Sequence, residues 1–346
     1  MIFATVPIAQ AEGCYLAHSL QGANGRIAKG TELGAAELAD LAAAGHQDLT
    51  VARLEPGDLH EDDAARRLAQ ALLPDPAAYG LRISGAGAGR VNLHALGPGV
   101  VRVQADRINA LNAVNPMITL ATVPDFHRAD AGSMVATAKI ISYAVPEAAL
   151  QRATRDVAGA IRLAPVTLRR AVLIETRVTD DIPSDKGRAA IVGRLDRFAM
   201  ALAPRQVVAH RVPDLAAAMT AAVSAPVNAS VDDQPGCDLI MVLTGSATSD
   251  AQDVAPSALR AAGGQMVRFG MPVDPGNLLF LGQLAGRPVL GLPGCARSIA
   301  LNGADWVLER LVCGLEVRSE DIAGLGVGGL LKEIPTRPRP RHQDGT

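Results

Sequence analysis

A short polar segment directly after an apolar run offers the clearest chemistry in this chain. Residues 239–243 are entirely apolar, which is typical of a strand buried on both faces. Hydroxyl and carboxylate residues follow, and Pro256 then opens a predicted helix. A strand that ends in small residues before a helix presents free backbone N–H groups, and the helix dipole favours negative charge there. The segment therefore predicts an anion-binding loop.

This first loop, residues 244–253, contains most of the candidate ligand contacts. The substrate-binding candidates are Thr244, Gly245, Ser246, Thr248 and Ser249. Asp250 and Asp253 argue against a site for phosphate alone, because carboxylates repel phosphate and attract metal ions. We take them as candidate catalytic residues, with Asp253 as a ligand for Mg²⁺. The alternatives are a plain strand-to-helix turn, in which Asp253 only caps the helix and Asp250 is an ordinary exposed acid.

A second loop of the same kind occupies residues 288–298. A short apolar run ends in Pro293 and Gly294, and a helix is predicted from about Arg297 to Leu311. The substrate-binding candidates of this loop are Pro293, Gly294, Cys295, Arg297 and Ser298. In an open α/β sheet, two such loops lie at the carboxyl ends of neighbouring strands, where these folds bind ligands.

Cys295 and Arg297 each have two interpretations. A cysteine at a helix start has a lowered thiol pKa, so Cys295 could be reactive or could contact a metal. It could equally be a small buried residue without chemistry. Arg297 and Ser298, in the first predicted helical turn, could hold phosphate, although many arginines are simply surface residues.

The two loops resemble a known family. Residues 244–258, Thr-Gly-Ser-Ala-Thr-Ser-Asp-Ala-Gln-Asp-Val-Ala-Pro-Ser-Ala, resemble the Thr-Gly-Gly-Thr-Gly…Arg-Asp-Val-Thr-Pro-Glu-Ala signature of the molybdopterin-binding domain. That domain occurs in molybdopterin adenylyltransferases and molybdopterin molybdotransferases. Residues 270–277, 281–288 and 292–295 are similar, in order and spacing, to the molybdotransferase elements Lys-Pro-Gly-Lys-Pro, Phe-Gly, Lys-Pro-Val and Pro-Gly-Asn-Pro. The resemblance covers residues 168–315, and residues 11–19 are loosely similar to the element that opens molybdotransferases.

The resemblance implies molybdopterin, its nucleotide form or the molybdenum cofactor as ligand, with Mg²⁺ as a further cofactor. The chain departs from the family patterns at Ser246, at Thr248-Ser249 where the family has Thr-Gly, and at Ala255, Asn277, Cys295 and Ala296. The changed positions line the expected pocket, so the ligand class should persist while the parental chemistry should not. One hypothesis is a binding module that presents molybdopterin to a nucleotidyltransferase or a molybdoenzyme. The other is an active Mg²⁺-dependent adenylyltransferase or molybdotransferase.

Composition excludes several other classes of protein. The formal charge is −2 and aromatic residues make up 3%, so neither a basic field nor stacking platforms for nucleic acid are expected. No apolar run approaches the length of about 20 residues that spans a membrane, and no signal peptide is visible. Four scattered cysteines fit free thiols in a reducing compartment. We therefore expect a cytoplasmic protein without nucleic-acid or membrane partners, and the resembling families make a homo-oligomer plausible.

The pattern along the chain predicts the domain organisation. Residues 1–76 read as an α+β unit and residues 77–146 as a β-rich unit. Residues 147–331 alternate between helix and strand, with a connecting helix predicted over residues 147–161 and another helix over residues 187–203, which predicts a doubly wound α/β domain. Residues 332–346 read as a disordered basic tail. The predicted fold class is thus a doubly wound α/β molybdopterin-binding domain after a smaller α+β and β-rich region. Arg107, Asn109, Asn112 and Lys139 form a candidate second polar site, with a purely structural role as the alternative.

Overall fold

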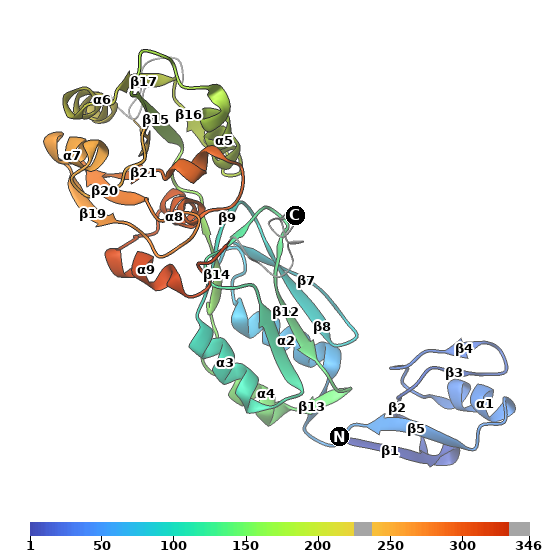
Figure 1. Ribbon diagram of the computed structural model, residues 1–346. Helices are drawn as coiled ribbons and strands as arrows, with labels where there is room; N and C mark the ends of the chain where they lie inside the picture. The colour runs from blue at the N-terminus through green and yellow to red at the C-terminus, as the bar shows by residue number, and fades with distance from the viewer. Residues whose placement is uncertain (225–236, 332–346) are drawn as a thin grey trace, which may run out of the picture. The chain divides into compact units, whose positions relative to one another are not determined.

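The computed structural model describes residues 1–224 and 237–331 (Figure 1). The chain forms two compact units. The first comprises Met1–Gly97 with Val101–Leu163, and the second comprises Pro98–Val100 and the chain from Ala164 onward. Residues 332–346, predicted to be a disordered tail, lie outside the described residues.

The first unit begins with a small antiparallel sheet in the order β1-β5-β2. Its elements are β1 (Ile2–Pro7), η1 (Ile8–Gln10), β2 (Tyr15–Leu16), the β3 (Leu20–Gln21)–β4 (Arg26–Ile27) hairpin, α1 (Ala35–Ala43) and β5 (Asp48–Arg53). Leu16, Leu33, Leu41 and Leu49 form its core. Helix α1 ends before Gly45, whose φ of 91° suits glycine.

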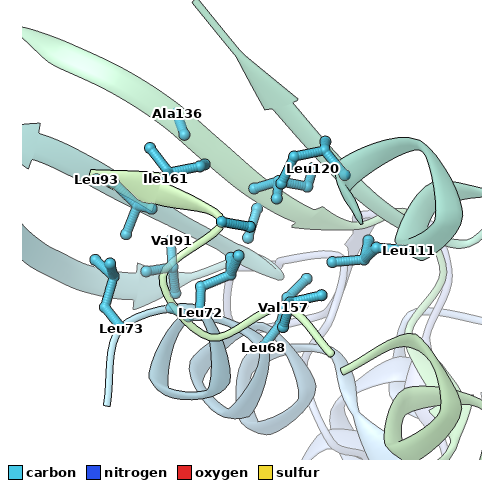
Figure 2. Close-up of a cluster of buried hydrophobic side chains, with 14 of the residues drawn as sticks. Leu68, Leu72, Leu73, Val91, Leu93, Leu111, Leu120, Ala136, Val157 and Ile161 are labelled. Atoms are coloured by element: carbon cyan, nitrogen blue, oxygen red, sulfur yellow. The ribbon is translucent and has the colours of Figure 1, made fainter. Parts of the chain in front are cut away.

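The rest of the first unit packs a four-stranded antiparallel sheet, in the order β10-β12-β8-β7, against helices. Two smaller sheets have the strand orders β11-β9-β14 and β13-β6. The strands of the three sheets are β6 (Asp58–His60), β7 (Leu81–Gly87), β8 (Arg90–Ala95), β9 (Gly99–Val103), β10 (Ile118–Thr122), β11 (His127–Ala129), β12 (Met134–Ile140), β13 (Ala144–Pro146) and β14 (Ile161–Pro165). The helices are α2 (Glu61–Leu72), α3 (Ala105–Val114) and α4 (Glu147–Ala153). Leu68 and Leu72, one turn apart on α2, face Val91 and Leu93 of β8 across this core (Figure 2).

Residues 147–163, which we expected in the α/β domain, belong to the first unit. The predicted connecting helix is also shorter than expected, because α4 ends at Ala153. The reason is packing: Ala149, Leu150 and Ala153 are buried in the same core as α2. The apolar face of α4 therefore completes the first unit.

The second unit is built on one mixed sheet in the order β16-β15-β18-β21-β20-β19, with β17 also paired to β15. Its strands are β15 (Arg170–Arg177), β16 (Ala201–Leu202), β17 (Gln206–Ala209), β18 (Leu239–Leu243), β19 (Gln265–Phe269), β20 (Phe280–Leu284) and β21 (Arg287–Gly291). The strands β15, β16, β17, β18 and β21 pair in parallel, whereas β20 pairs antiparallel with both β21 and β19.

Helices cover both faces of this sheet. Helices α6 (Val212–Ser224) and α7 (Val254–Ala261) lie together on one face, and α5 (Asp185–Asp196) and α8 (Gly303–Val312) lie on the other (Figure 1). The short α9 (Ser319–Ala323) and η3 (Gly324–Gly326) follow. All five residues of β18 are buried, as its unbroken apolar run predicts for a strand covered on both faces. The predicted doubly wound α/β class is confirmed.

One predicted helix ends early. We expected a helix over residues 187–203, but α5 ends at Asp196 and residues 201–202 form β16. The chain turns at Ala199, which has a φ of 52°, and the backbone of Ala201 and Leu202 pairs with the start of β15. Pairing with a strand about 30 residues away overrides a local helical pattern, as tertiary context commonly does.

Among residues 1–224 and 237–331, no helix has both the length and the apolar character needed to cross a membrane.

Gly291 is a specific requirement of this sheet. It lies opposite Phe280 in the β20–β21 pair, and a Cβ there would fall 1.9 Å from the buried Phe280 ring. We expect Gly291→Ala to lower the free energy of unfolding by about 1–3 kcal/mol through overpacking. The control is Gly193→Ala on the exposed surface of α5, where a Cβ meets nothing within 4 Å. That change should stabilise by up to about 1 kcal/mol. Equal urea midpoints for the two variants would contradict this account.

Candidate functional site

Three strands of the second unit end side by side. β15, β18 and β21 are parallel neighbours, and Val242 pairs with Ile174 on one side and Gly291 on the other. The segments that leave these strand ends are residues 178–184, 244–253 and 292–302. Helix α5 follows β15 onto one face and α7 follows β18 onto the opposite face, which makes the topological switch point where open α/β sheets bind ligands. The two predicted loops therefore share one edge, the carboxyl edge.

Two of the predicted contacts in the first loop serve the loop itself. Thr244 and Thr248 are 5% and 6% exposed. The Thr244 hydroxyl donates to the Ser246 carbonyl (2.6 Å) and lies 3.2 Å from the Thr248 hydroxyl. Gly245, Ser246 and Ser249 are exposed. The backbone and side chains of these three residues are thus the groups that can reach a ligand.

Gly245 lies tightly against the end of β15. Its amide donates to the Thr176 hydroxyl (2.8 Å), and a Cβ on Gly245 would fall 2.7 Å from the Thr176 carbonyl oxygen. This close backbone approach explains why a glycine stands here. It also fixes the first loop to the neighbouring strand.

Asp253 is the N-cap of α7. One carboxylate oxygen accepts from the Val254 amide (2.7 Å), and the other accepts from the Ser249 amide (3.0 Å). Asp250 accepts from the Gln252 amide (2.7 Å). Across the described ranges, no three His, Cys, Asp or Glu side chains are grouped to hold a metal ion. Mg²⁺ at these aspartates would have to take most of its ligands from phosphate and water.

The second loop differs from its prediction. Residues 294–297 form the 3-10 helix η2 (Gly294–Arg297), and α8 begins only at Gly303. The helix predicted from about Arg297 is therefore wrong at its start. Asn302 caps α8 by accepting from the Ala304 amide (2.9 Å), while Asp305 accepts from the Asn302 amide (2.8 Å). This reciprocal cap is a stronger start signal than any residue near Arg297.

Of the two interpretations of Cys295, the structure favours a small residue without chemistry. The cysteine lies in a four-residue 3-10 helix, whose dipole is too small to lower the thiol pKa appreciably. Burial raises the pKa of the Cys295 thiol, and the nearby Arg194 lowers it less. The side chain is half-buried, and the other three cysteines are buried. Cys295 is a neutral thiol at neutral pH, which makes it a poor nucleophile and metal ligand.

Arg297 joins the two loops. Its guanidinium donates to the Thr244 carbonyl in the first loop. Its aliphatic stem lies against α5, where a Cβ on Gly187 would fall 3.3 Å from Arg297 Cγ. Pro293 is buried, whereas Gly294 and Ser298 are exposed beside Arg297. The contact to Thr244 confirms that the two predicted loops lie together.

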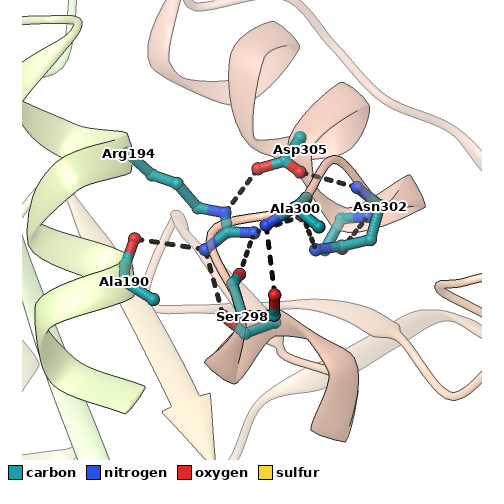
Figure 3. Close-up of polar contacts among 8 residues, drawn as sticks. Ala190, Arg194, Ser298, Ala300, Asn302 and Asp305 are labelled. Atoms are coloured by element: carbon teal, nitrogen blue, oxygen red, sulfur yellow. Dashed lines mark hydrogen bonds and ion pairs between the residues drawn. The ribbon is translucent and has the colours of Figure 1, made fainter. Parts of the chain in front are cut away.

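Sequence reasoning missed Arg194, which anchors the second loop from α5 (Figure 3). The side chain is 5% exposed and pairs through Nε with Asp305 of α8. Nη1 donates to the carbonyls of Ala190 (3.1 Å) and Ala296 (3.0 Å), and Nη2 donates to those of Ser298 (2.9 Å) and Ala300 (3.1 Å). All five N–H donors of the guanidinium are used. The available signal was an arginine among the apolar positions of α5, next to Leu195.

The segment after β15 was also missed as part of this edge. Glu175, 2% exposed, accepts from Arg205 at 2.8 and 3.1 Å, and Arg205 also pairs with Asp185 at the start of α5. The hydrogen bond with Glu175 raises the pKa of the Arg205 guanidinium. The signal was present in the sequence: a buried strand runs into Thr179, Asp180 and Asp181 before a helix, as β18 does.

The candidate second polar site is accounted for by the fold of the first unit. Arg107 pairs with Asp156 (2.6 Å). Asn112 exchanges two hydrogen bonds with the backbone of Leu120 (2.8 and 3.0 Å). Lys139 contacts Glu61 at 3.5 Å. These contacts favour the structural alternative.

No protein-family model and no curated protein sequence matches this chain. Solved structures with a similar fold include two of the molybdopterin biosynthesis moeA protein from Pyrococcus horikoshii. One is 11% identical with a TM-score of 0.31, covering 90% of this chain and 75% of that one. The other is 10% identical with a TM-score of 0.27, covering 93% and 75%. The structure of molybdenum cofactor biosynthesis protein B is 13% identical with a TM-score of 0.30, covering 43% of this chain and 95% of that one. These likenesses are weak, so the ligand has to be inferred from the loops of this chain.

Removing the carboxylate that holds Arg194 should be costly. Asp305→Ala leaves a buried guanidinium without its counter-ion and removes the acceptor for the Asn302 amide. We expect the free energy of unfolding to fall by about 3–5 kcal/mol. Asp185→Ala, which breaks an exposed pair with Arg205, should cost about 0–1 kcal/mol. Urea unfolding of both variants tests this, and a similar small effect of each would show that Arg194 does not depend on Asp305.

The raised thiol pKa predicts slow modification of Cys295. The thiolate forms only above the ordinary cysteine range of about pH 8.5, so alkylation of the folded protein should remain slow at neutral pH and accelerate as the pH rises beyond that range. Iodoacetamide labelling followed by peptide mass spectrometry measures the rate at Cys295 itself. Rapid labelling at neutral pH would restore the reactive-thiol interpretation.

Proposed function

We propose that the second unit binds molybdopterin, or its nucleotide form, at the carboxyl edge of β18 and β21 and presents it to a partner enzyme of molybdenum cofactor biosynthesis. The observation that carries the proposal is the contact from Arg297 to the Thr244 carbonyl. It joins the two segments whose residues resemble the molybdopterin-binding signature, although 53 positions separate them. Two loops that bind one ligand must lie together, as these two do.

The exposed groups at this edge suit a phosphate. In the first loop the exposed Ser246 presents its backbone amide and hydroxyl, because the Gly245 and Ser249 amides already donate to Thr176 and Asp253. Gly294, Arg297 and Ser298 lie on the second loop beside it. N–H groups, hydroxyls and a guanidinium are the usual partners of phosphate oxygens. These residues would hold the terminal phosphate of molybdopterin. A neutral thiol is a poor metal ligand, so Cys295 would not hold the metal. The dithiolene of the bound ligand would hold it instead.

The same geometry favours presentation over group transfer. Both carboxylate oxygens of Asp253 accept backbone amides, so the capping of α7 accounts for the position of this residue without a metal. Asn277, where the family pattern has lysine, directs its side-chain amide to the Met271 carbonyl (3.4 Å). Phosphoryl transfer depends on metal ions and cations placed at the reacting group. A nucleotidyltransferase or a molybdoenzyme, acting in trans, would then carry out the chemistry.

Retention of a fluorescent oxidised pterin by the purified chain tests binding directly. We expect about one pterin per chain after incubation with molybdopterin and desalting. Gly245→Ala should weaken retention, because its Cβ would displace the first loop from Thr176. Gly193→Ala, at a position with open space on α5, is the matched control and should retain the pterin. Equal retention by both variants would show that the first loop does not contribute to pterin binding.

Incubation of the complex with Mg-ATP and molybdate distinguishes the module from the transferase. We expect no adenylylated or metal-loaded pterin beyond the unreacted ligand when the products are separated by chromatography. Multiple turnovers would instead favour the Mg²⁺-dependent transferase.

A further inference from the structure

A basic hollow opens at the same carboxyl edge, and no residue of the two motif loops lines it. Its volume is about 360 Å³, and its lining residues come from the ends of β15 and β17. They are Arg177, Val178, Thr179, Asp180, Ala209, His210 and Arg211, which we call the 177–211 pocket. The lining is predominantly polar, so the pocket suits a charged ligand group.

A chain of two hydrogen bonds links the pocket to the first loop. The Gly245 amide donates to the Thr176 hydroxyl (2.8 Å), and that hydroxyl lies 2.8 Å from Nδ1 of His210. Thr176 is 1% exposed, so a single buried hydroxyl separates the loop backbone from the histidine ring. When the Thr176 hydroxyl donates to Nδ1, the His210 Nε2 carries a proton that it can donate to a ligand.

The charges around the pocket favour an anion. Arg177 and Arg211 are two cations in the lining, and the positive end of α6 begins immediately after Arg211. Asp180 is the one lining carboxylate; it contacts Arg177 at 3.5 Å, and its side chain is fully solvated. Asp214 adds a second acid in the first turn of α6. Guanidinium groups with an imidazole donor are well matched to phosphate oxygens.

We propose that the 177–211 pocket binds the second phosphate of a diphosphate-linked ligand, the nucleotide form of the pterin. The first phosphate lies on the 244–253 loop, and the second is held by Arg177, His210 and Arg211. The Thr176 hydroxyl bonds to both the Gly245 amide of the first loop and the His210 ring of the pocket, so the pocket lies directly beside the loop. The inference rests on the proposed function for the pterin half of the ligand, and it makes the second phosphate the group by which this chain selects the nucleotide form.

Inorganic pyrophosphate and inorganic phosphate are the probes, titrated by calorimetry into the full chain. Pyrophosphate should bind more tightly than phosphate. Arg211→Gln and Arg177→Gln should each weaken pyrophosphate binding by about tenfold, the effect of losing one charge-assisted contact, and weaken phosphate binding less, because phosphate can still occupy the first loop. Arg211 is exposed, so its variant should fold normally. The matched control is Arg169→Gln, an exposed arginine just before the opposite end of β15.

Two results would overturn the proposal for this pocket. One is equal affinity for the two probes. The other is pyrophosphate binding that is as strong in the Arg211 and Arg177 variants as in the Arg169 control. Retention of molybdopterin is measured on the same samples and separates this inference from the proposed function. Arg211-dependent pyrophosphate binding without any molybdopterin retention would reject the proposed function and keep the pocket. Molybdopterin retention with Arg211-independent pyrophosphate binding would reject the pocket alone.

Discussion

The buried pair of Arg194 and Asp305 is the interaction on which the candidate site depends. The chain between β21 and α8 makes one short 3-10 turn and then runs irregularly to Asn302. Its carbonyls at Ala296, Ser298 and Ala300 have no regular structure to supply donors, and a buried carbonyl without a partner is costly. Arg194 supplies those donors from α5, and Asp305 neutralises its charge.

A buried ion pair is not stabilising in itself, because desolvating two charges can cost as much as their attraction returns. Its contribution here is positional. The fork of the guanidinium has five donors in fixed directions, so it accepts only one arrangement of the surrounding carbonyls. The second loop therefore has one conformation relative to α5. Because Arg297 belongs to the second loop, Arg194 also positions its guanidinium, which donates to the Thr244 carbonyl of the first loop.

The carboxyl edge thus divides its polar groups between two tasks. Thr244, Thr248 and Asp253 bond within the first loop and hold its shape. Gly245, Ser246 and Ser249 are exposed at the same place. Pre-organised donors bind an anion with less loss of conformational entropy than a mobile loop would. On the other side of Thr176, the basic groups of Arg177 and Arg211 extend the same edge.

The sequence by itself determined the parts that depend on local pattern. The apolar run at residues 239–243 predicted a doubly buried strand, and the small and hydroxyl residues after it predicted the loop. What the tertiary structure decided were pairings between distant residues. Arg194 and Asp305 are 111 positions apart, and an arginine among the apolar positions of α5 does not reveal which residue will be its partner. Likewise, the sequence pattern at Ala201 and Leu202 is helical, but in the folded chain these residues form a strand that pairs with β15. Local periodicity carries no information about which distant backbone will supply a partner, so the anchor of the second loop became visible only once the chain was folded.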